Sequence, residues 1–303
     1  MSSQASFRPR DAALLLLLAL VWGNSFFFIK TAVAVVPPPW IVTIRMVLGA
    51  MLLFVIARVT GQKAPGNLRS VGQMALIGIF GSALPWLCQA WSQRYLDSGL
   101  VSVLNAVTPV VTLLLAVALR QERLYTNRVL GLGLAVLGAL IVVGLEIRAG
   151  RSPLALFGAV LATLGYAIAA VLTRSYVSGR MSNVWAAATQ LACGAVLLGP
   201  IAWATQGAPP SALPLGVAGA LLALGLLGTG LAFLIYFVLL ERVGATNTSM
   251  VTYLVPVVGL TSGALFRGER FGPNVYAGAC AMIAGVWLAQ RAPRAAAVPR
   301  ASH

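Results

Sequence analysis

Ten runs of mainly apolar residues, separated by short polar joints, follow one another along the 303-residue chain. Each run is close to the roughly 20 residues that an α-helix needs to cross the hydrocarbon core of a bilayer. Joints such as GQKAPGN and FGPN contain the Gly and Pro residues that end helices. We therefore predict an all-α membrane protein with transmembrane helices over residues 12–34, 40–60, 71–94, 98–119, 127–146, 153–175, 183–205, 214–240, 246–266 and 273–291.

The second half of the chain repeats the first. The stretch PVVTLLLAVALRQER at 109–123 returns as PVVGLTSGALFRGER at 256–270. Over 30 positions compared at this fixed offset of 147, 10 residues are identical, among them a Pro, a Glu, an Asn and two Gly. Each half holds five helices, an odd number, so the second half must enter the membrane from the opposite side. Inverted repeats of this kind are typical of secondary transporters. The prediction is two five-helix repeats around a central cavity, residues 1–146 and 147–291, with a cytoplasmic tail at 292–303.

Composition and charge agree with a membrane protein. The chain is 59% hydrophobic and 9% charged, with a mean hydropathy of +0.91, whereas soluble domains carry about one quarter charged residues. The net charge of +15 comes from Lys and Arg at the ends of apolar runs, without the basic stripe of a nucleic-acid-binding surface. With the N-terminus inside, 14 of the 21 basic residues face the cytoplasm and 6 face outward. The positive-inside rule then places both termini in the cytoplasm.

Residues that support enzyme chemistry are sparse. The three cysteines (Cys88, Cys193 and Cys280) lie in separate apolar runs without metal or disulfide spacing, and the single histidine is His303. We therefore expect no metal, cofactor or catalytic site. A membrane-embedded enzyme would need paired carboxylates, a His or a metal cluster facing a cavity, and the sequence supplies none of these. A receptor or scaffold would need longer joints between the helices. All acidic residues fall at predicted helix ends or in joints: Asp11, Asp97, Glu122, Glu146, Glu241 and Glu269.

The two copies of the repeat carry a family resemblance. A Pro that opens a helix, a Gly-Glu or similar pair about a dozen residues later (here within an Arg-x-Glu-Arg joint) and a Gly-spaced helix resemble the end of each half in the drug/metabolite transporter superfamily. The stretch VWGNSFFFIK at 21–30, and Arg45 followed by LGA, resemble its EamA-type branch. Gln121 departs from the second copy, which has Gly268. The resemblance implies a ten-helix exporter of metabolites, amino acids among them, in a bacterial plasma membrane.

Polar and aromatic residues inside the predicted spans are candidates to contact a substrate, because polar groups in a bilayer usually face a cavity or another helix. Each also has a structural interpretation, as a hydrogen bond between helices or as an anchor at the interface. The candidates for the substrate cavity are Trp22, Asn24, Trp86, Gln89, Asn105, Tyr166, Gln190, Tyr236 and Tyr253. Pro109 and Pro256 are candidate hinges, with an inert packing kink as the alternative. Arg45 or a helix N-terminus is available for a carboxylate.

These observations predict a secondary transporter that exports amino acids, including aromatic or apolar ones, and related metabolites. A broad-range exporter of drugs or toxic metabolites is the alternative. The hypothesis of a cationic-drug exporter is weakened, because extrusion of cations usually needs a carboxylate within the membrane. The same absence predicts transport without an obligatory proton couple. The expected partners are a small-molecule substrate and the lipid bilayer. A monomer suffices to enclose a cavity, because one copy of the chain contains both repeats.

Overall fold

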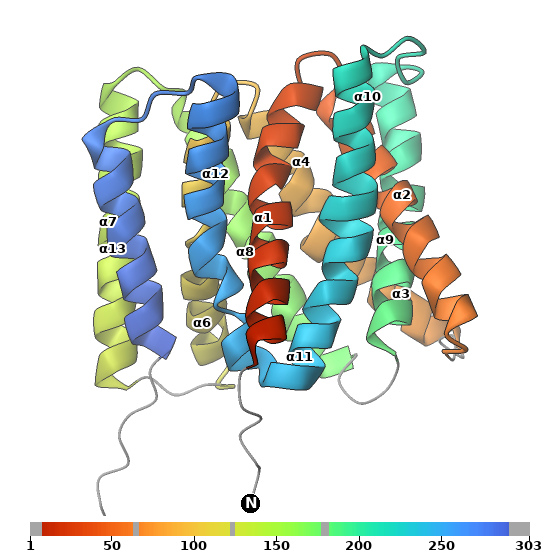
Figure 1. Ribbon diagram of the computed structural model, residues 1–303, viewed down its shortest axis with the longest axis horizontal. Helices are drawn as coiled ribbons and strands as arrows, with labels where there is room; N and C mark the ends of the chain where they lie inside the picture. Colours follow the sequence, from red (N-terminus) through yellow and green to blue (C-terminus); the bar gives the residue numbers. More distant parts are fainter. Residues whose placement is uncertain (1–7, 63–66, 122–124, 177–181, 291–303) are drawn as a thin grey trace, which may run out of the picture.

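The computed structural model describes residues 8–62, 67–121, 125–176 and 182–290, which contain helices joined by loops and no strand. In this part of the chain, eight helical spans are long and apolar enough to cross a membrane. With the shorter apolar helix α12 (Val251–Arg267) and with α13 (Pro273–Gln290), the described residues form ten helical spans, the number that the sequence predicts. The spans stand side by side (Figure 1). Glu122, Arg123 and the predicted tail at 292–303 lie outside the described residues.

Most spans are single helices, and three are interrupted. The other uninterrupted helices are α1 (Pro9–Ala32), α2 (Pro38–Val59), α7 (Thr126–Arg148), α8 (Pro153–Tyr176) and α9 (Asn183–Gln206). The third span consists of α3 (Leu68–Gly78), the π-helical η1 (Ile79–Ala83) and α4 (Leu84–Ser92); the fourth consists of α5 (Ser98–Asn105) and α6 (Thr108–Ala118). The eighth consists of α10 (Leu215–Leu222), the π-helical η2 (Ala223–Leu231) and α11 (Ala232–Thr248).

The fourth predicted helix, 98–119, is broken at 106–107 for a reason that the sequence contains. Pro109 has no backbone N–H, so it cannot donate to the carbonyl of Asn105 four residues earlier. The Thr108 hydroxyl donates to that carbonyl instead, at 2.7 Å. The ninth predicted helix, 246–266, also begins differently. The chain bends at Gly244, which has a φ of 78°, and α12 begins only at Val251.

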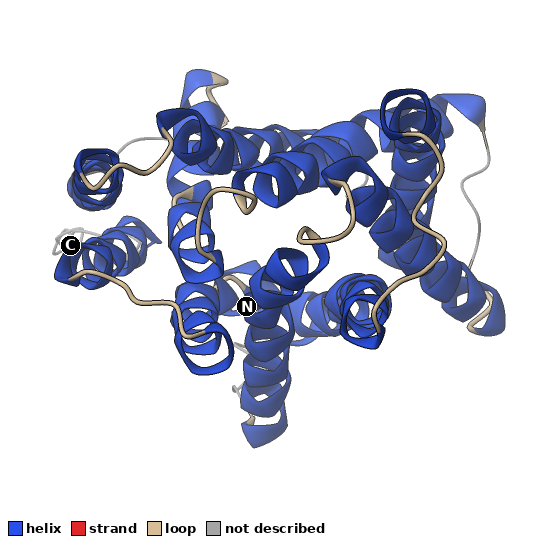
Figure 2. Ribbon diagram, turned by 90° about the horizontal axis from the view of Figure 1, so that it is seen from above, coloured by secondary structure: helices blue, strands red, loops and turns tan. Residues whose placement is uncertain are grey.

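Packing between the halves follows the inverted repeat. The two second helices, α2 and α9, pack together, and so do the two last helices, α7 and α13. In the first half, α1 packs against α12 and against η2 and α11. In the second half, α8 makes the corresponding contacts with α5 and α6 and with α4 and η1. The view along the helices shows α7 and α13 as a pair at one edge of the molecule (Figure 2). Each of these contacts thus has an image under exchange of the two repeats, as expected for an inverted duplication.

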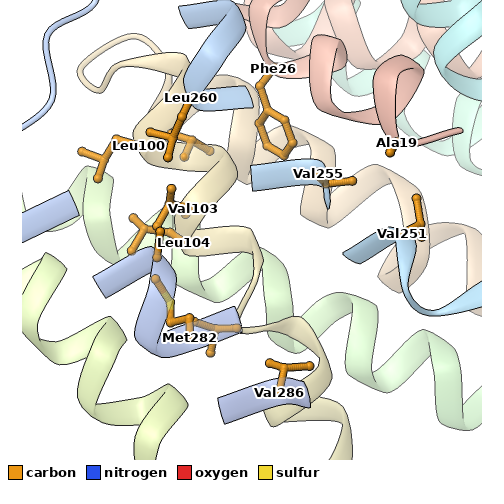
Figure 3. Close-up of a cluster of buried hydrophobic side chains, with 14 of the residues drawn as sticks. Ala19, Phe26, Leu100, Val103, Leu104, Val251, Val255, Leu260, Met282 and Val286 are labelled. Atoms are coloured by element: carbon orange, nitrogen blue, oxygen red, sulfur yellow. The ribbon is translucent and has the colours of Figure 1, made fainter. Parts of the chain in front are cut away.

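The apolar core joins elements from both halves. Phe26 of α1, Leu100 and Leu104 of α5, and Val255 of α12 are buried in one cluster that reaches Met282 of α13 (Figure 3). A second cluster forms between α2 and α9. Other large apolar side chains point outward, among them Leu16, Leu17 and Leu20 of α1, which are 54%, 42% and 51% exposed. A surface of this kind suits lipid rather than water.

Small residues bring α7 and α13 together. A Cβ atom added to Gly138 would lie 2.8 Å from the backbone oxygen of Gly278, so only glycine permits this approach. Gly131 stands in the same relation to the backbone of Gly285. Small residues at a helix interface let two backbones approach closely in this way. Gly133 in the same helix has no such role, because a Cβ atom there would have no described atom of another element within 4 Å.

Candidate functional site

Two π-helical turns lie at equivalent positions of the repeats, η1 at 79–83 and η2 at 223–231. π-helical turns inside α-helices are frequent at functional sites. Gly81 and Gly228 occupy them at the offset of 147. A Cβ atom on Gly228 would lie 2.8 Å from the Ser25 hydroxyl oxygen and 4.0 Å from Arg45 Nη2. The absent side chain therefore lets η2 approach α1 and α2 closely.

Arg45, in the interior of α2, is the central charge of this region. The side chain is buried, with the residue only 5% exposed. Its Nε donates to the Thr229 hydroxyl oxygen at 2.9 Å, and its Nη2 donates to the Gly228 carbonyl at 3.3 Å. The guanidinium carbon lies 3.8 Å from the centre of the Trp86 ring. Thr229 in turn donates to the Leu224 carbonyl, five residues back, in the π-helical turn. The π-helical turn η2 therefore shapes the surroundings of Arg45.

A chain of hydrogen bonds between amide and phenol groups begins on the same helix as Trp86. Gln89 Nε2 donates to Asn105 Oδ1 at 3.0 Å, and the Tyr166 hydroxyl donates to Gln89 Oε1 at 3.5 Å. Gln89 is buried, whereas Asn105 and Tyr166 are half-buried. Tyr166 packs against the apolar cluster that contains Trp86. Four predicted site residues thus meet, on α4, α5 and α8, next to the interrupted end of α5. Arg45, Trp86, Gln89, Asn105, Tyr166 and Thr229 are called the Arg45 cluster below.

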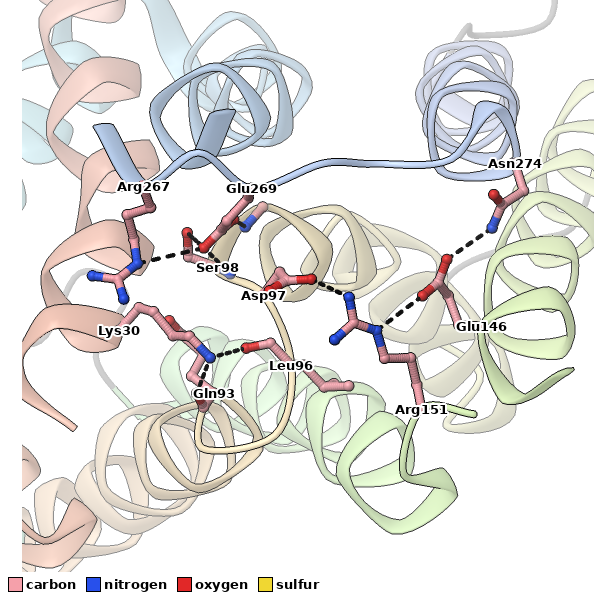
Figure 4. Close-up of polar contacts among 11 residues, drawn as sticks. Lys30, Gln93, Leu96, Asp97, Ser98, Glu146, Arg151, Arg267, Glu269 and Asn274 are labelled. Carbon is pink, nitrogen blue, oxygen red and sulfur yellow. Dashed lines mark hydrogen bonds and ion pairs between the residues drawn. The ribbon is translucent and has the colours of Figure 1, made fainter. Parts of the chain in front are cut away.

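The carboxylates that the structure describes lie away from the Arg45 cluster. Asp11 Oδ1 is 3.0 Å from Arg242 Nη2, where α1 begins near the end of α11. The others lie in α11 or in a network that joins both repeats at the opposite end of the helices (Figure 4). The Arg45 cluster consequently combines one cation with neutral amide, hydroxyl and aromatic groups.

The network at that end connects the loops that follow α4, α7 and α12. Lys30 Nζ donates to the carbonyls of Gln93 and Leu96, each at 2.7 Å. Glu269 accepts from Ser98 N at 2.9 Å, from the Ser98 hydroxyl at 2.8 Å and from Gly99 N at 3.0 Å. These contacts tie α1 and the start of α5 to the segment after α12. An anion at a helix N-terminus is stabilised by the free N–H groups and the helix dipole.

Arg151, at the start of the second repeat, extends the same network. It forms an ion pair with Asp97 and lies 3.6 Å from Glu146, which accepts from Asn274 Nδ2 at 2.9 Å. Within the described part of the repeated Arg-x-Glu-Arg joint, Arg267 Nε lies 3.7 Å from Glu269 Oε1. The end of α1 and the loops that follow α4, α7 and α12 therefore meet in one polar layer (Figure 4).

The remaining predicted site residues lie elsewhere. Trp22 and Tyr236 form an aromatic pair between α1 and α11, with ring centres 5.7 Å apart. Asn24 Oδ1 accepts from the Ser262 hydroxyl at 2.9 Å, which joins α1 to α12. These contacts fit the structural interpretation of hydrogen bonds and packing between helices.

Tyr253 and Gln190 are also separate from the Arg45 cluster. The Tyr253 hydroxyl donates to Gln290 Oε1 at 2.6 Å, toward the end of α13. Gln190 presents its backbone carbonyl to Gly78 at the end of α3, so its backbone rather than its side chain makes the close contact. The candidate hinges differ in kind. Pro109 lies in the first turn of α6, directly after the break, whereas Pro256 lies within the continuous helix α12.

Sequence reasoning singled out Arg45 for a carboxylate but missed its partners Gly228 and Thr229. Both lie in an apolar, glycine-rich run without a polar pattern. The available signal is the Gly81/Gly228 pair at the repeat offset, which marks an equivalent position in both halves. That signal does not reveal a π-helical turn, because the turn depends on how the neighbouring helices pack.

Comparison with known proteins adds the family. The EamA-like transporter family matches residues 11–144 and 153–290. The chain is 26% identical to the uncharacterized transporter YoaV of Bacillus subtilis, over 89% of this chain and 93% of the relative. It is 25% identical to a probable amino-acid metabolite efflux pump of Escherichia coli, over 92% and 94% of the two chains. It is also 25% identical to a probable terminal-alkyne amino-acid exporter of Streptantibioticus cattleyicolor, over 91% and 92%.

A solved crystal structure shares the architecture. Its TM-score is 0.66 at 16% identity, and the match covers 93% of this chain and 96% of that chain. At this identity the likeness concerns the fold alone. The two family matches span most of the chain and contain every residue of the Arg45 cluster. The chain therefore belongs to the EamA-like transporter family.

Proposed function

We propose that this transporter exports amino acids with apolar or aromatic side chains, and related small metabolites, across the bacterial plasma membrane. The observation that carries the proposal is the Arg45 cluster, a set of neutral hydrogen-bonding and aromatic groups around one buried cation. Such a set offers amide and hydroxyl partners to a zwitterion and ring surface to its side chain. The names of two relatives, which refer to amino-acid efflux or export, support the same substrate class.

The proposed mechanism is alternating access. The repeats 1–146 and 147–291 would rock against each other, so that substrate between them meets one side of the membrane and then the other. The breaks at 106–107 and after Gly244 would absorb the motion, with Pro109 and Pro256 in the moving helices. Both termini would be cytoplasmic, so the network around Glu269 would close the outer face and would have to break for release.

Proton coupling is not required in this mechanism. The Arg45 cluster contains no described carboxylate that could carry a proton through the membrane. Amino acids would therefore move down their own gradients, and one monomer would suffice as the transport unit.

Counterflow in proteoliposomes tests the function directly. Vesicles loaded with unlabelled L-phenylalanine, at equal pH on both sides, should take up radiolabelled L-phenylalanine faster than empty vesicles. Unlabelled L-leucine and other apolar amino acids should compete. Strict dependence on an imposed pH gradient would exclude uncoupled exchange. Uptake of cationic dyes without any amino-acid counterflow would support the drug exporter instead.

A further inference from the structure

Arg45 is a buried cation without an anionic partner among the described residues. Its contacts there are the Thr229 hydroxyl, the Gly228 carbonyl and the Trp86 ring. A guanidinium has five N–H donors, and only Nε and Nη2 of Arg45 take part in these hydrogen bonds. Buried charges in proteins are normally paired with an opposite charge, because neutral groups compensate only part of the lost hydration.

Some other described arginines are paired with carboxylates, which sets Arg45 apart from them. Arg242 pairs with Asp11, Arg151 with Asp97, and Arg267 with Glu269. Each of those pairs lies at a helix end or in a joint between helices. Arg45 is more deeply buried than these three arginines and has the greatest need of a carboxylate, yet the described part of the chain supplies none.

The inverted repeat shows that Arg45 is not a requirement of the scaffold. Residues 40–57 match 185–202 at an offset of 145, which pairs Trp40 with Trp185 and Gly49 with Gly194, so the position equivalent to Arg45 is the neutral Gln190 in α9. At the offset of 147, the position equivalent to Thr229 is Ser82 in η1. The Ser82 hydroxyl is fully buried and has no hydrogen-bond partner within the described ranges. The second half therefore makes the same helix contacts, between α9 and η1, without an arginine. Packing alone does not explain why the first half contains one.

The surroundings of Arg45 hold its guanidinium in a defined orientation. Thr229 and Gly228 contact one edge of the planar group, and the Trp86 ring covers a face. Trp86 also belongs to the apolar cluster against which Tyr166 packs. A planar guanidinium that is fixed in this way, with N–H donors left over, matches a carboxylate, which arginine binds through two parallel hydrogen bonds.

We propose that Arg45 binds the α-carboxylate of the transported amino acid, and that Trp86 and Tyr166 contact its apolar side chain. This inference rests on the proposed function and makes it more specific. The substrate must carry a free carboxylate, and the substrate completes the ion pair that the protein lacks. Amino-acid amides and esters, which lack the carboxylate, should be poor substrates even when their side chains are the same.

The test compares L-phenylalanine with L-phenylalaninamide as competitors of labelled L-phenylalanine counterflow. Truncating one partner of a buried hydrogen-bonded charge pair costs roughly 2 kcal/mol or more, which corresponds to about 30-fold in affinity. In the native protein we therefore expect the amide to compete at least about 30-fold less well than the acid. Equal competition by the two compounds would overturn the role of Arg45 while leaving amino-acid transport intact. Absence of any amino-acid counterflow would refute the proposed function itself.

Variants separate binding from a structural role. R45Q should raise the KM for L-phenylalanine by about 30-fold and abolish the preference for acid over amide. R45K, which keeps the charge but not the planar fork, should keep part of that preference.

R58Q is the matched control, because Arg58 lies on the same helix and stacks on Trp185 at 5.8 Å but is exposed at the end of that helix. It should leave KM and preference unchanged. If R45Q lowers the transport of both compounds equally, Arg45 is structural and the inference is wrong. If R45Q does not fold, the inference is tested by the native protein alone, through the ratio of competition by L-phenylalanine to competition by L-phenylalaninamide.

Discussion

Replacement of Glu269 by alanine is expected to loosen the network that joins the two repeats. The Glu269 side chain is 5% exposed and accepts three hydrogen bonds at the N-terminus of α5, from Ser98 N, the Ser98 hydroxyl and Gly99 N. Asp97, which directly precedes α5, makes no side-chain cap of its own. The first N–H groups of α5 therefore depend on a residue from the other repeat.

The size of the effect follows from these contacts. A hydrogen bond to a charged group contributes about 1.5–3 kcal/mol, and three bonds that share one carboxylate are not fully additive. We therefore expect E269A to lower the free energy of opening this end of the molecule by about 3 kcal/mol. At 1.4 kcal/mol per factor of ten, this corresponds to an increase of about 100-fold in the population of the open form.

Hydrogen exchange measured by mass spectrometry is the direct assay. In purified protein in lipid nanodiscs, peptides that cover residues 98–105 should exchange about 100-fold faster in E269A than in the native protein. E269Q keeps one acceptor oxygen but loses the charge, so its exchange should lie between the two. E241Q is the control, since Glu241 is an exposed residue of α11 outside this network. If exchange in E269A matches that in E241Q, the carboxylate does not hold the start of α5 and the argument fails.

Two further predictions concern contacts between helices. Gly138→Leu should separate α7 from α13 and destabilise the protein by about 1–3 kcal/mol, since its Cβ would lie 2.8 Å from the Gly278 backbone oxygen. Gly133→Leu, at an open position of the same helix, is the control in a thermal unfolding scan, and equal losses in both variants would contradict the packing argument. Arg242→Gln should cost about 3–5 kcal/mol, because it leaves the 3%-exposed Asp11 without its cation. Adding Asp11→Asn should restore part of that loss, and strictly additive losses in a double-mutant cycle would show that the two residues are not coupled.

The candidate site was predictable only in part, as four residues illustrate. Trp86, Gln89, Asn105 and Tyr166 could be singled out because polar and large aromatic groups within apolar runs are conspicuous. The same criterion selected Asn24, which the structure uses to join α1 to α12 through Ser262. An amide within a membrane helix needs a partner in either case, so its presence alone does not distinguish a site from a contact between helices.

The sequence by itself determined the ten spans, the division into two halves and their opposite orientation. Those properties depend on the length of apolar runs, on an odd number of spans and on the repeat offset, and all three can be read along one chain. Even the break before Pro109 is local, because a missing N–H leaves the Asn105 carbonyl to the Thr108 hydroxyl.

Only the tertiary structure decided which residues work together. Arg45 reaches Thr229 across 184 positions of the sequence, and Glu269 caps Ser98 across 171. Such pairs depend on how the two repeats are placed against each other, which no local pattern encodes. The π-helical turn that presents Gly228 to Arg45 has the same origin. The sequence places an arginine in only one of the two halves, and the packing determines that this arginine is buried beside Thr229 and Gly228.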